Sequence, residues 1–431
     1  MHFTYHPPVL AAAALAAVVL ASCRDATEPE APNSIEPPVF SLSIGDAIQI
    51  TTDPGHSRYP AISGDRIVWH DSRTGLTNIF MYDLTTGEET QITSAGGAVP
   101  DISGDRIVYH AQRVPLDQNV YLFDFATGTE TQITTDPKWQ GHPKISGSRI
   151  VWSDWRKGNL DIFMYDLETG VETQITTDPA TQVSPQISGD LIVWEDTRTG
   201  DRDIFMHDLT TGEETRITYD PLFQRFPMIS GDRIVWGDIR FGGGEYQIFM
   251  YDVTAGTERQ ITASPARPGY KSISGNFIVW SDWRNPGGDI FMFDLESNQE
   301  VQVTSDPGQV AENDVFGDRI VWAENLSGNW DIFMVELSTA VVPAIEAIAD
   351  QVDQFVSDGL IDTNTGIQHS LVELLEQAAA AFDRGNAAAA ASILSRGFIN
   401  LVTAQAGKKI STEAAQILIE LAQEVVDDMS E

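Results

Sequence analysis

Over most of its length the chain alternates short apolar runs with polar turns, as β-strands joined by tight turns do. Three copies show the pattern most clearly: ISGDRIVW at 62–69, ISGSRIVW at 145–152 and ISGDRIVW at 229–236. The turn glycine recurs seven times at spacings of 40 to 44 residues, as Gly64, Gly104, Gly147, Gly189, Gly231, Gly275 and Gly317. Repeats of this length, built from several short strands, are typical of β-propellers, so we expect seven blades.

Each repeat contains four strand-like pieces. In the third copy they end at 146 and span 149–154, 161–167 and 172–177. A second turn glycine recurs before the fourth piece and becomes Asn298 in the sixth copy. Asn tolerates positive φ better than most residues, so we expect a left-handed turn at this position.

The fourth-strand segments are out of phase with the rest of the repeat. Seven are present, and the first, 48–51, precedes the first complete copy, whereas the seventh copy ends at Leu337 without one. We therefore predict that 48–51 pairs with the third strand of the last blade and closes the ring. The expected fold of 46–340 is an all-β, seven-bladed propeller of four-stranded antiparallel blades, closed by an N-terminal strand.

After residue 340 the composition changes to Ala, Leu, Ile, Val and Glu with helical periodicity. Apolar positions such as Leu371, Leu375 and Ala378 fall on one helix face, as bundle packing requires. We expect four helices, at 342–357, 365–383, 387–405 and 412–428, with Gly385 and Gly407 as C-terminal stops and Ser411 as an N-cap. Residues 341–431 are thus predicted to form a small all-α bundle.

The N-terminus has the pattern of an export signal. Val9 to Leu20 is almost wholly apolar, long enough for a signal peptide and short of the ~20 residues of a membrane-spanning helix. The following Leu20-Ala21-Ser22-Cys23 resembles a bacterial lipobox, although His2 and His6 stand where Lys or Arg is expected. This resemblance implies cleavage of residues 1–22 and lipidation of Cys23, the single cysteine; the alternative is a lone buried cysteine.

Residues 23–45 are rich in proline and acidic side chains and are predicted to be a tether. The expected location is therefore extracytoplasmic, on the periplasmic side or the surface of a bacterium, with the membrane reached only through the lipid anchor. The formal net charge is −37, from 63 acidic and 26 basic residues. Such acidity argues against a nucleic-acid partner and against electrostatic binding to anionic lipid.

Two family resemblances follow from these motifs. The repeats over about 46–337 resemble TolB-like propeller repeats, which pair a serine-containing turn with an aromatic-ending strand, although S-G-D-R replaces their usual S-P-D-G. This resemblance implies a cell-envelope propeller that binds other macromolecules, and it implies no particular partner. The segments GLIDTNTGIQHSLVELLEQAAAAFDRGN and FINLVTAQAGKKISTEAAQILI, within about 359–426, resemble the FIMAH domain of secreted bacterial proteins.

Residues present in every copy are most simply explained by the fold. We expect Trp69, Tyr109, Trp152, Trp194, Trp236, Trp280 and Trp322 to form the core between blades. A recurrent Arg lies two residues after a recurrent Asp in most copies, as in Asp154 and Arg156, and is predicted to form a structural ion pair. If exposed, each pair would contribute only ~0–1 kcal/mol.

Binding residues are sought where the copies diverge, around one mouth of the propeller. The position before the recurrent Ile-Ser step reads Tyr59, Val99, His142, Ser184, Phe226, Tyr270 and Glu312, and Arg58 and Arg225 precede two of these. Trp155 and Trp283 occur in two loops only, and blade five carries an insertion near Gly242-Gly243-Gly244. The candidate ligand-binding residues are Arg58, Tyr59, His142, Trp155, Arg225, Phe226, Tyr270 and Trp283. Aromatic rings beside Arg suit a protein or glycan ligand, while the alternative is that they plug the mouth.

An enzyme is the alternative function, because some seven-bladed bacterial propellers are metal-dependent polysaccharide lyases. His70 and His110 occupy the same register in blades one and two, with Glu195 there in blade four. Packed sheets lie ~10 Å apart, so the two histidines should be too distant to share one ion. We expect no metal site, no cofactor and no catalytic residues, and the preferred function is binding.

Overall fold

The structure is a computed structural model that describes residues 43–114, 117–242, 245–263, 267–305, 308–326, 328–338, 341–362, 366–383 and 387–428. The leader, Cys23 and most of the tether lie outside the described residues, as do Gly243, Gly244, Thr365 and Gly385. In the part of the chain that is described, no helix combines the length and apolarity needed to cross a membrane.

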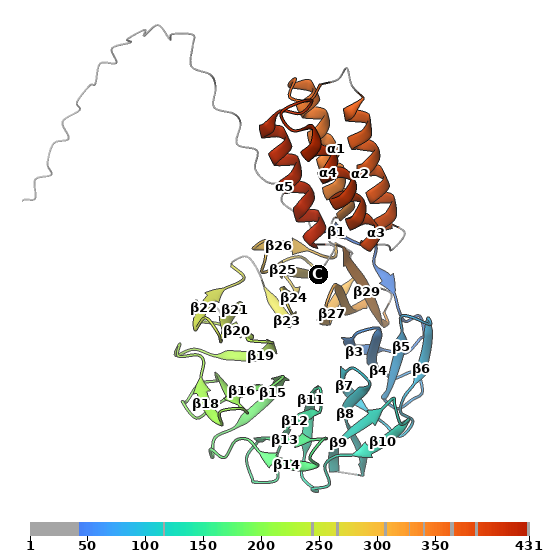
Figure 1. The fold of residues 1–431 in the computed structure, drawn as a ribbon. Helices are drawn as coiled ribbons and strands as arrows, with labels where there is room; N and C mark the ends of the chain where they lie inside the picture. Colours follow the sequence, from blue (N-terminus) through green and yellow to red (C-terminus); the bar gives the residue numbers. More distant parts are fainter. Residues whose placement is uncertain are drawn as a thin grey trace, which may run out of the picture. The chain divides into compact units, whose positions relative to one another are not determined.

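Seven antiparallel sheets form the blades of the predicted propeller, six of them with four strands and the last completed by strands from the N-terminus (Figure 1). Blade one contains β3 (Ser57–Ser63), β4 (Arg66–Asp71), β5 (Asn78–Asp83) and β6 (Glu88–Gln91). Blade two contains β7 (Ala98–Ser103), β8 (Arg106–Val114), β9 (Asp117–Asp124) and β10 (Thr129–Gln132). Blade three contains β11 (Gln140–Ser146), β12 (Arg149–Asp154), β13 (Asp161–Asp166) and β14 (Val171–Gln174). Blade four contains β15 (Gln182–Ser188), β16 (Leu191–Asp196), β17 (Asp203–Asp208) and β18 (Glu213–Arg216).

The remaining blades repeat the order until the last strand. Blade five contains β19 (Gln224–Ser230), β20 (Arg233–Asp238), β21 (Gln247–Asp252) and β22 (Thr257–Gln260). Blade six contains β23 (Pro268–Ser274), β24 (Phe277–Asp282), β25 (Asp289–Asp294) and β26 (Gln299–Gln302). Blade seven contains β27 (Gln309–Phe316), β28 (Arg319–Asn325) and β29 (Trp330–Ser338). The first strands of the blades, β3, β7, β11, β15, β19, β23 and β27, surround the propeller axis (Figure 1).

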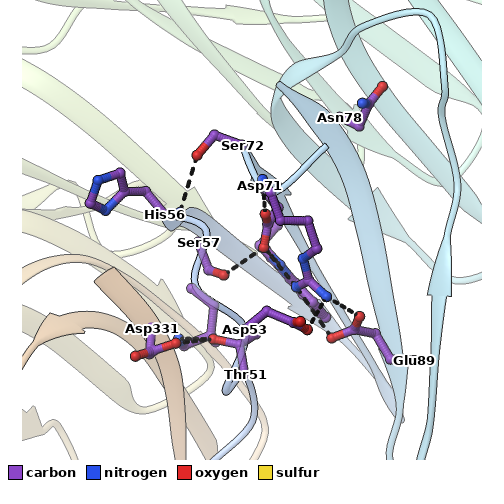
Figure 2. Close-up of polar contacts among 12 residues, drawn as sticks. Thr51, Asp53, His56, Ser57, Asp71, Ser72, Asn78, Glu89 and Asp331 are labelled. Carbon is purple, nitrogen blue, oxygen red and sulfur yellow. Dashed lines mark hydrogen bonds and ion pairs between the residues drawn. The ribbon is translucent and has the colours of Figure 1, made fainter. Parts of the chain in front are cut away.

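The ring closes as the phase of the repeat predicts. The N-terminal β2 (Ile48–Gln49) pairs antiparallel with β29, with Ile48 opposite Met334, and β1 (Ser43–Ile44) extends this pairing. Thr51 continues the closure, because its hydroxyl donates to Asp331 over 3.0 Å and accepts the Ile332 amide over 2.9 Å. Figure 2 shows Thr51 and Asp331 in contact beside Asp53. The chain's first strand therefore supplies the strand that the last copy lacks.

The core between blades consists of the recurrent aromatic residues and their neighbours, as predicted. The six tryptophans of the second strands and Tyr109 are at most 1% exposed. Each stacks on the aromatic residue opposite it in the third strand, as Trp152 does on Phe163 with 6.2 Å between ring centroids. Asn298 has a φ of 58°, which confirms the left-handed turn.

The C-terminal region is helical, as predicted, with one irregular helix. It contains α1 (Val341–Ser357), α2 (Ile367–Asp383), α3 (Ala387–Ser392), the π-helical η2 (Ile393–Ile399), α4 (Asn400–Gln405) and α5 (Thr412–Asp428). The continuous helix expected over 387–405 thus includes a π-helical segment at its centre. Gly407 has the positive φ of a helix stop, 70°, and the Ser411 hydroxyl caps α5 by accepting the Ala414 amide. Residues such as Leu371, Leu394 and Leu418 form the core of this region.

Candidate ligand-binding site

The recurrent Asp and Arg form a buried structural unit in five blades. In blade three, Trp152 Nε1 donates to Asp154 over 2.9 Å, and Arg156 Nη2 binds the same carboxylate over 2.6 Å. The Arg156 guanidinium lies 4.3 Å from the Phe163 ring centroid and reaches Glu172 on the fourth strand. The ion pair is confirmed, but it is not a surface pair, because Asp154 is 0% exposed. The unit links three strands of one blade and belongs to the scaffold.

Blades two and seven depart from this unit. Ala111 replaces the Asp in blade two, where Arg113 and the Tyr109 hydroxyl both bind Glu130 instead. In blade seven Glu324 replaces the Asp and accepts the Trp322 indole N–H over 2.8 Å. Neither replacement creates an exposed group with an evident ligand.

The position at which the copies diverge lies at a β-bulge in the first strand of each blade, and in most blades its backbone is in the left-handed region of φ/ψ space. Five of its residues have φ between 50° and 56°: Tyr59, Val99, His142, Ser184 and Phe226. All five precede a proline, whereas Tyr270 and Glu312 precede Lys271 and Asn313 and are not among the positive-φ residues. A left-handed conformation costs a non-glycine residue about 1–2 kcal/mol, and its recurrence assigns the bulge to the scaffold. The side chain carried on each bulge remains free to differ.

Three candidate residues, Arg58, Tyr59 and Tyr270, meet at one place at the mouth. Together with Glu312 and Trp330 they form what we call the Arg58 cluster. Arg58 binds Glu312 through two hydrogen bonds, of 2.9 and 2.5 Å, and its guanidinium lies 4.3 Å from the Trp330 ring centroid. Burial, together with the charge of the nearby Glu312, raises the pKa of Tyr270 to about 12. The cluster joins blades one, six and seven at the mouth.

Two other candidates, Arg225 and Phe226, lie beside Glu195. Together with Arg202 and Lys271 these residues form what we call the Glu195 cluster. Glu195 is 0% exposed and accepts the Phe226 amide over 2.9 Å. Arg202 forms an ion pair with its carboxylate, and Arg225 Nε lies 3.5 Å from it. The Arg225 guanidinium and the Lys271 ammonium both approach the Phe226 ring, at 4.5 and 5.5 Å from its centroid. Burial lowers the pKa of Lys271 to about 7.

His142 contacts neither cluster directly; burial lowers its pKa, and the charge of Glu195 opposes this shift. Its ring makes an edge contact with Trp139 at 5.5 Å between centroids and lies 6.3 Å from the His110 ring. Burial lowers the pKa of His70 and of His110 to about 4, so both are neutral at neutral pH. Among the described residues, no group of three or more His, Cys, Asp or Glu side chains is placed to hold a metal ion.

The two loop tryptophans differ in their surroundings. Trp283 covers the backbone of blade six, since a Cβ added at Gly269 would collide with its ring. In blade three the corresponding place over Gly141 is taken by Trp139, and Trp155 is 47% exposed. The site therefore brings together Arg58, Tyr59 and Tyr270 in one group and Arg225 and Phe226 in another, and leaves Trp155 and Trp283 on the loops around them.

Sequence reasoning missed Lys271, Arg202 and Trp330 and the role of Glu195. One signal was available, because Lys271 occupies a position that is proline in blades one to five. The ion pair between Arg58 and Glu312 joins residues 254 positions apart and had no signal in the repeat.

The comparisons agree with this architecture. Residues 345–427 match the FIMAH domain family. The propeller domain of the trilobed protease from Pyrococcus furiosus, described as having an open velcro topology, aligns at 12% identity with a TM-score of 0.54, over 67% of this chain and 96% of that one. An oligogalacturonate lyase from Vibrio parahaemolyticus aligns at 13% identity with a TM-score of 0.54, over 69% and 96%. These two similarities show the propeller fold alone.

TolB from Acinetobacter baumannii aligns at 16% identity over 66% of this chain and 79% of that one, with a TM-score of 0.40 that carries no weight for the fold. No curated protein matches the chain in sequence. The described propellers thus include a protease domain and a lyase, and the activity of this chain is not given by its fold.

Proposed function

We propose that this protein is an extracytoplasmic binding protein whose propeller mouth holds a protein or glycan ligand. The observation that carries the proposal is the exposure of aromatic side chains where the copies diverge: Trp155 is 47% exposed, Phe226 46% and Tyr270 45%. Large aromatic residues beside arginines dominate the energy of many interfaces. None of them recurs in every blade, so the scaffold does not require them.

The other regions have supporting roles in this proposal. Lipidation of Cys23 anchors the chain to a membrane, and the tether holds the propeller away from the surface. The FIMAH domain provides a second docking or assembly element. A Cys23→Ser variant is expected to leave the membrane fraction, and a variant that still sediments with membranes would refute the anchor.

The binding proposal is tested by crosslinking in intact cell envelopes followed by purification of the protein. A Trp155→Ala/Phe226→Ala/Tyr270→Ala variant is expected to lose the main crosslinked partner. A matched control replaces Val171 and Phe316 with alanine. These side chains are 53% and 45% exposed and lie at hairpin turns, at the end of the strands opposite the mouth. An unchanged set of partners in the aromatic variant would remove this mouth as the binding site.

The alternative function, a polysaccharide-cleaving enzyme, is separated by a direct assay. Purified protein would then release unsaturated oligosaccharides, and a His142→Ala variant would lose this activity. We expect the wild-type protein to bind its ligand without turnover.

A further inference from the structure

We propose that the Glu195 cluster binds the carboxylate of an acidic sugar unit, with Lys271 and Arg225 as the cations that hold it. The inference rests on the proposed binding function and names the chemistry of its ligand. Lys271 is the residue of this cluster that departs most from the repeat, since the same position is proline in five blades and Asn313 in the seventh.

The Glu195 cluster contains more cationic than anionic side chains. Arg202, Arg225 and Lys271 surround a single carboxylate, Glu195, and both of its oxygens already accept hydrogen bonds. Arg202 and Arg225 share this one carboxylate, and Lys271 has no carboxylate of its own, so the cluster carries more positive than negative charge. This local excess of positive charge occurs in a chain whose net charge is −37, so it is not a consequence of composition.

Lys271 lacks the partner that a structural lysine has. Within the described residues no carboxylate lies within 4.0 Å of its ammonium, although the residue is only 7% exposed. Lys144, on the inner strand of blade three, is paired with Asp101 over 3.0 Å. Leaving a charge buried and unpaired is costly, and such groups cluster at functional sites. An incoming carboxylate would complete the pairing.

The surroundings favour a sugar over a peptide. Phe226 presents a half-exposed ring beside the two cations, and a pyranose ring has a flat C–H face next to its carboxylate. Because this carboxylate is fixed to a rigid ring, binding orders fewer bonds than it would for an acidic side chain on a flexible peptide. A rigid acidic sugar therefore fits a flat ring flanked by cations.

The protonation of Lys271 gives the proposal an independent readout. Burial lowers its pKa to about 7, and the charge of Glu195 on β16 opposes this shift. On the strands packed against β23, Glu312 of β27 is held by Arg58, Asp282 of β24 by Arg284, and Arg225 of β19 lies beside Glu195. A bound carboxylate favours the protonated amine, so binding should take up a proton near neutral pH and weaken above pH 7.

The test is calorimetry on the purified protein with a glucuronate trisaccharide and its carboxyl-reduced, neutral counterpart. We expect the acidic sugar to bind more than tenfold more tightly than the neutral one, and its affinity to fall about tenfold from pH 6 to pH 8. Lys271→Met should weaken the acidic sugar about tenfold or more and leave the neutral one unchanged. Lys271→Arg should retain binding and abolish the pH dependence, because arginine stays charged.

Lys157→Met is the matched control, since it removes the same charge from an exposed position on a loop of blade three. Removing a buried, unpaired cation should also leave the melting temperature of Lys271→Met equal or higher, whereas a structural lysine would lower it. Equal affinity for the two sugars, or equal effects of Lys271→Met and Lys157→Met, overturns the inference. Binding of an acidic peptide in place of the sugar overturns the ligand class. If crosslinking still depends on the aromatic residues, the proposed function stands in either case.

Discussion

Replacement of Arg73 by Met tests whether the repeated ion pair supports the propeller. Asp71 is 0% exposed and accepts hydrogen bonds from the Arg73 side chain and backbone, each over 2.7 Å, and from Ser57 over 2.8 Å. Figure 2 shows Asp71 beside Ser57, with Asp53 and Glu89 close by. Arg73 also binds Asp53 and Glu89, so it ties blade one to the segment that follows the closing strand.

The expected loss follows from the burial of Asp71. Removing one partner of a buried pair costs about 3–5 kcal/mol, and the hydrogen bonds that Asp71 keeps place the expected loss near 3 kcal/mol. Arg66→Met is the control, because Arg66 also stacks on an aromatic ring, Phe125, but pairs with Asp105, whose side chain is 61% exposed. This surface pair should contribute about 0–1 kcal/mol.

Urea unfolding measures both variants through tryptophan fluorescence. All ten tryptophans lie between Trp69 and Trp330, so the signal reports on the propeller without the helical region. A second substitution, Asp71→Asn, should recover part of the loss because no charge is then left buried. Equal losses for Arg73→Met and Arg66→Met would refute the argument from burial.

Three further predictions concern closure, acid stability and turn geometry. Deleting residues 46–53 removes several backbone hydrogen bonds and those of the Thr51 side chain, each worth about 1 kcal/mol. The melting temperature of the propeller should therefore fall by more than about 5 °C. An unchanged melting temperature would contradict closure by the N-terminal strand. Burial alone would raise the pKa of Asp71 and Asp282, but their arginine partners hold it below the usual value. The contribution of these two carboxylates to the free energy of unfolding is therefore complete above about pH 4 and is lost as the pH falls further. Unfolding midpoints measured over a pH series should show this loss of stability, and Asp71→Asn should make the loss smaller. Asn298→Ala should cost about 1 kcal/mol in urea unfolding while Asn298→Gly costs little, and equal costs would argue against left-handed strain.

The periodic part of the fold could be predicted from the sequence because each repeat carries its own turn and strand signals. The second strand of blade three, predicted at 149–154, is β12 with the same bounds, and the phase of the repeat located the closing strand. The π-helical η2 could not be predicted, because its residues follow the same apolar pattern as an ordinary helix. The leader, Cys23 and the lipid anchor stay predictions, since they lie outside the described residues.

The candidate site was predictable only as a location. The positions at which the copies diverge predicted the mouth of the propeller and most of its aromatic residues. Contacts between side chains of different blades could not be predicted, because they depend on distances that the repeat does not encode. Arg58 stays a predicted ligand-binding residue, and its ion pair with Glu312 of blade seven is one such contact across blades. Trp283 covers its own blade. Lys271 does not stand at the divergent bulge position but at the next one, which is proline in blades one to five.

Closure by β2 also determines when the propeller can be completed. Ile332 and Thr51 lie 281 positions apart, so the strand synthesised first pairs with the strand synthesised last. At typical rates of about 5–20 residues per second, the N-terminal strand waits roughly 15–60 s for its partner. During this interval the growing row of blades has an unpaired edge that another chain could occupy. Assembly of this protein is therefore most vulnerable to misassociation until its final blade emerges.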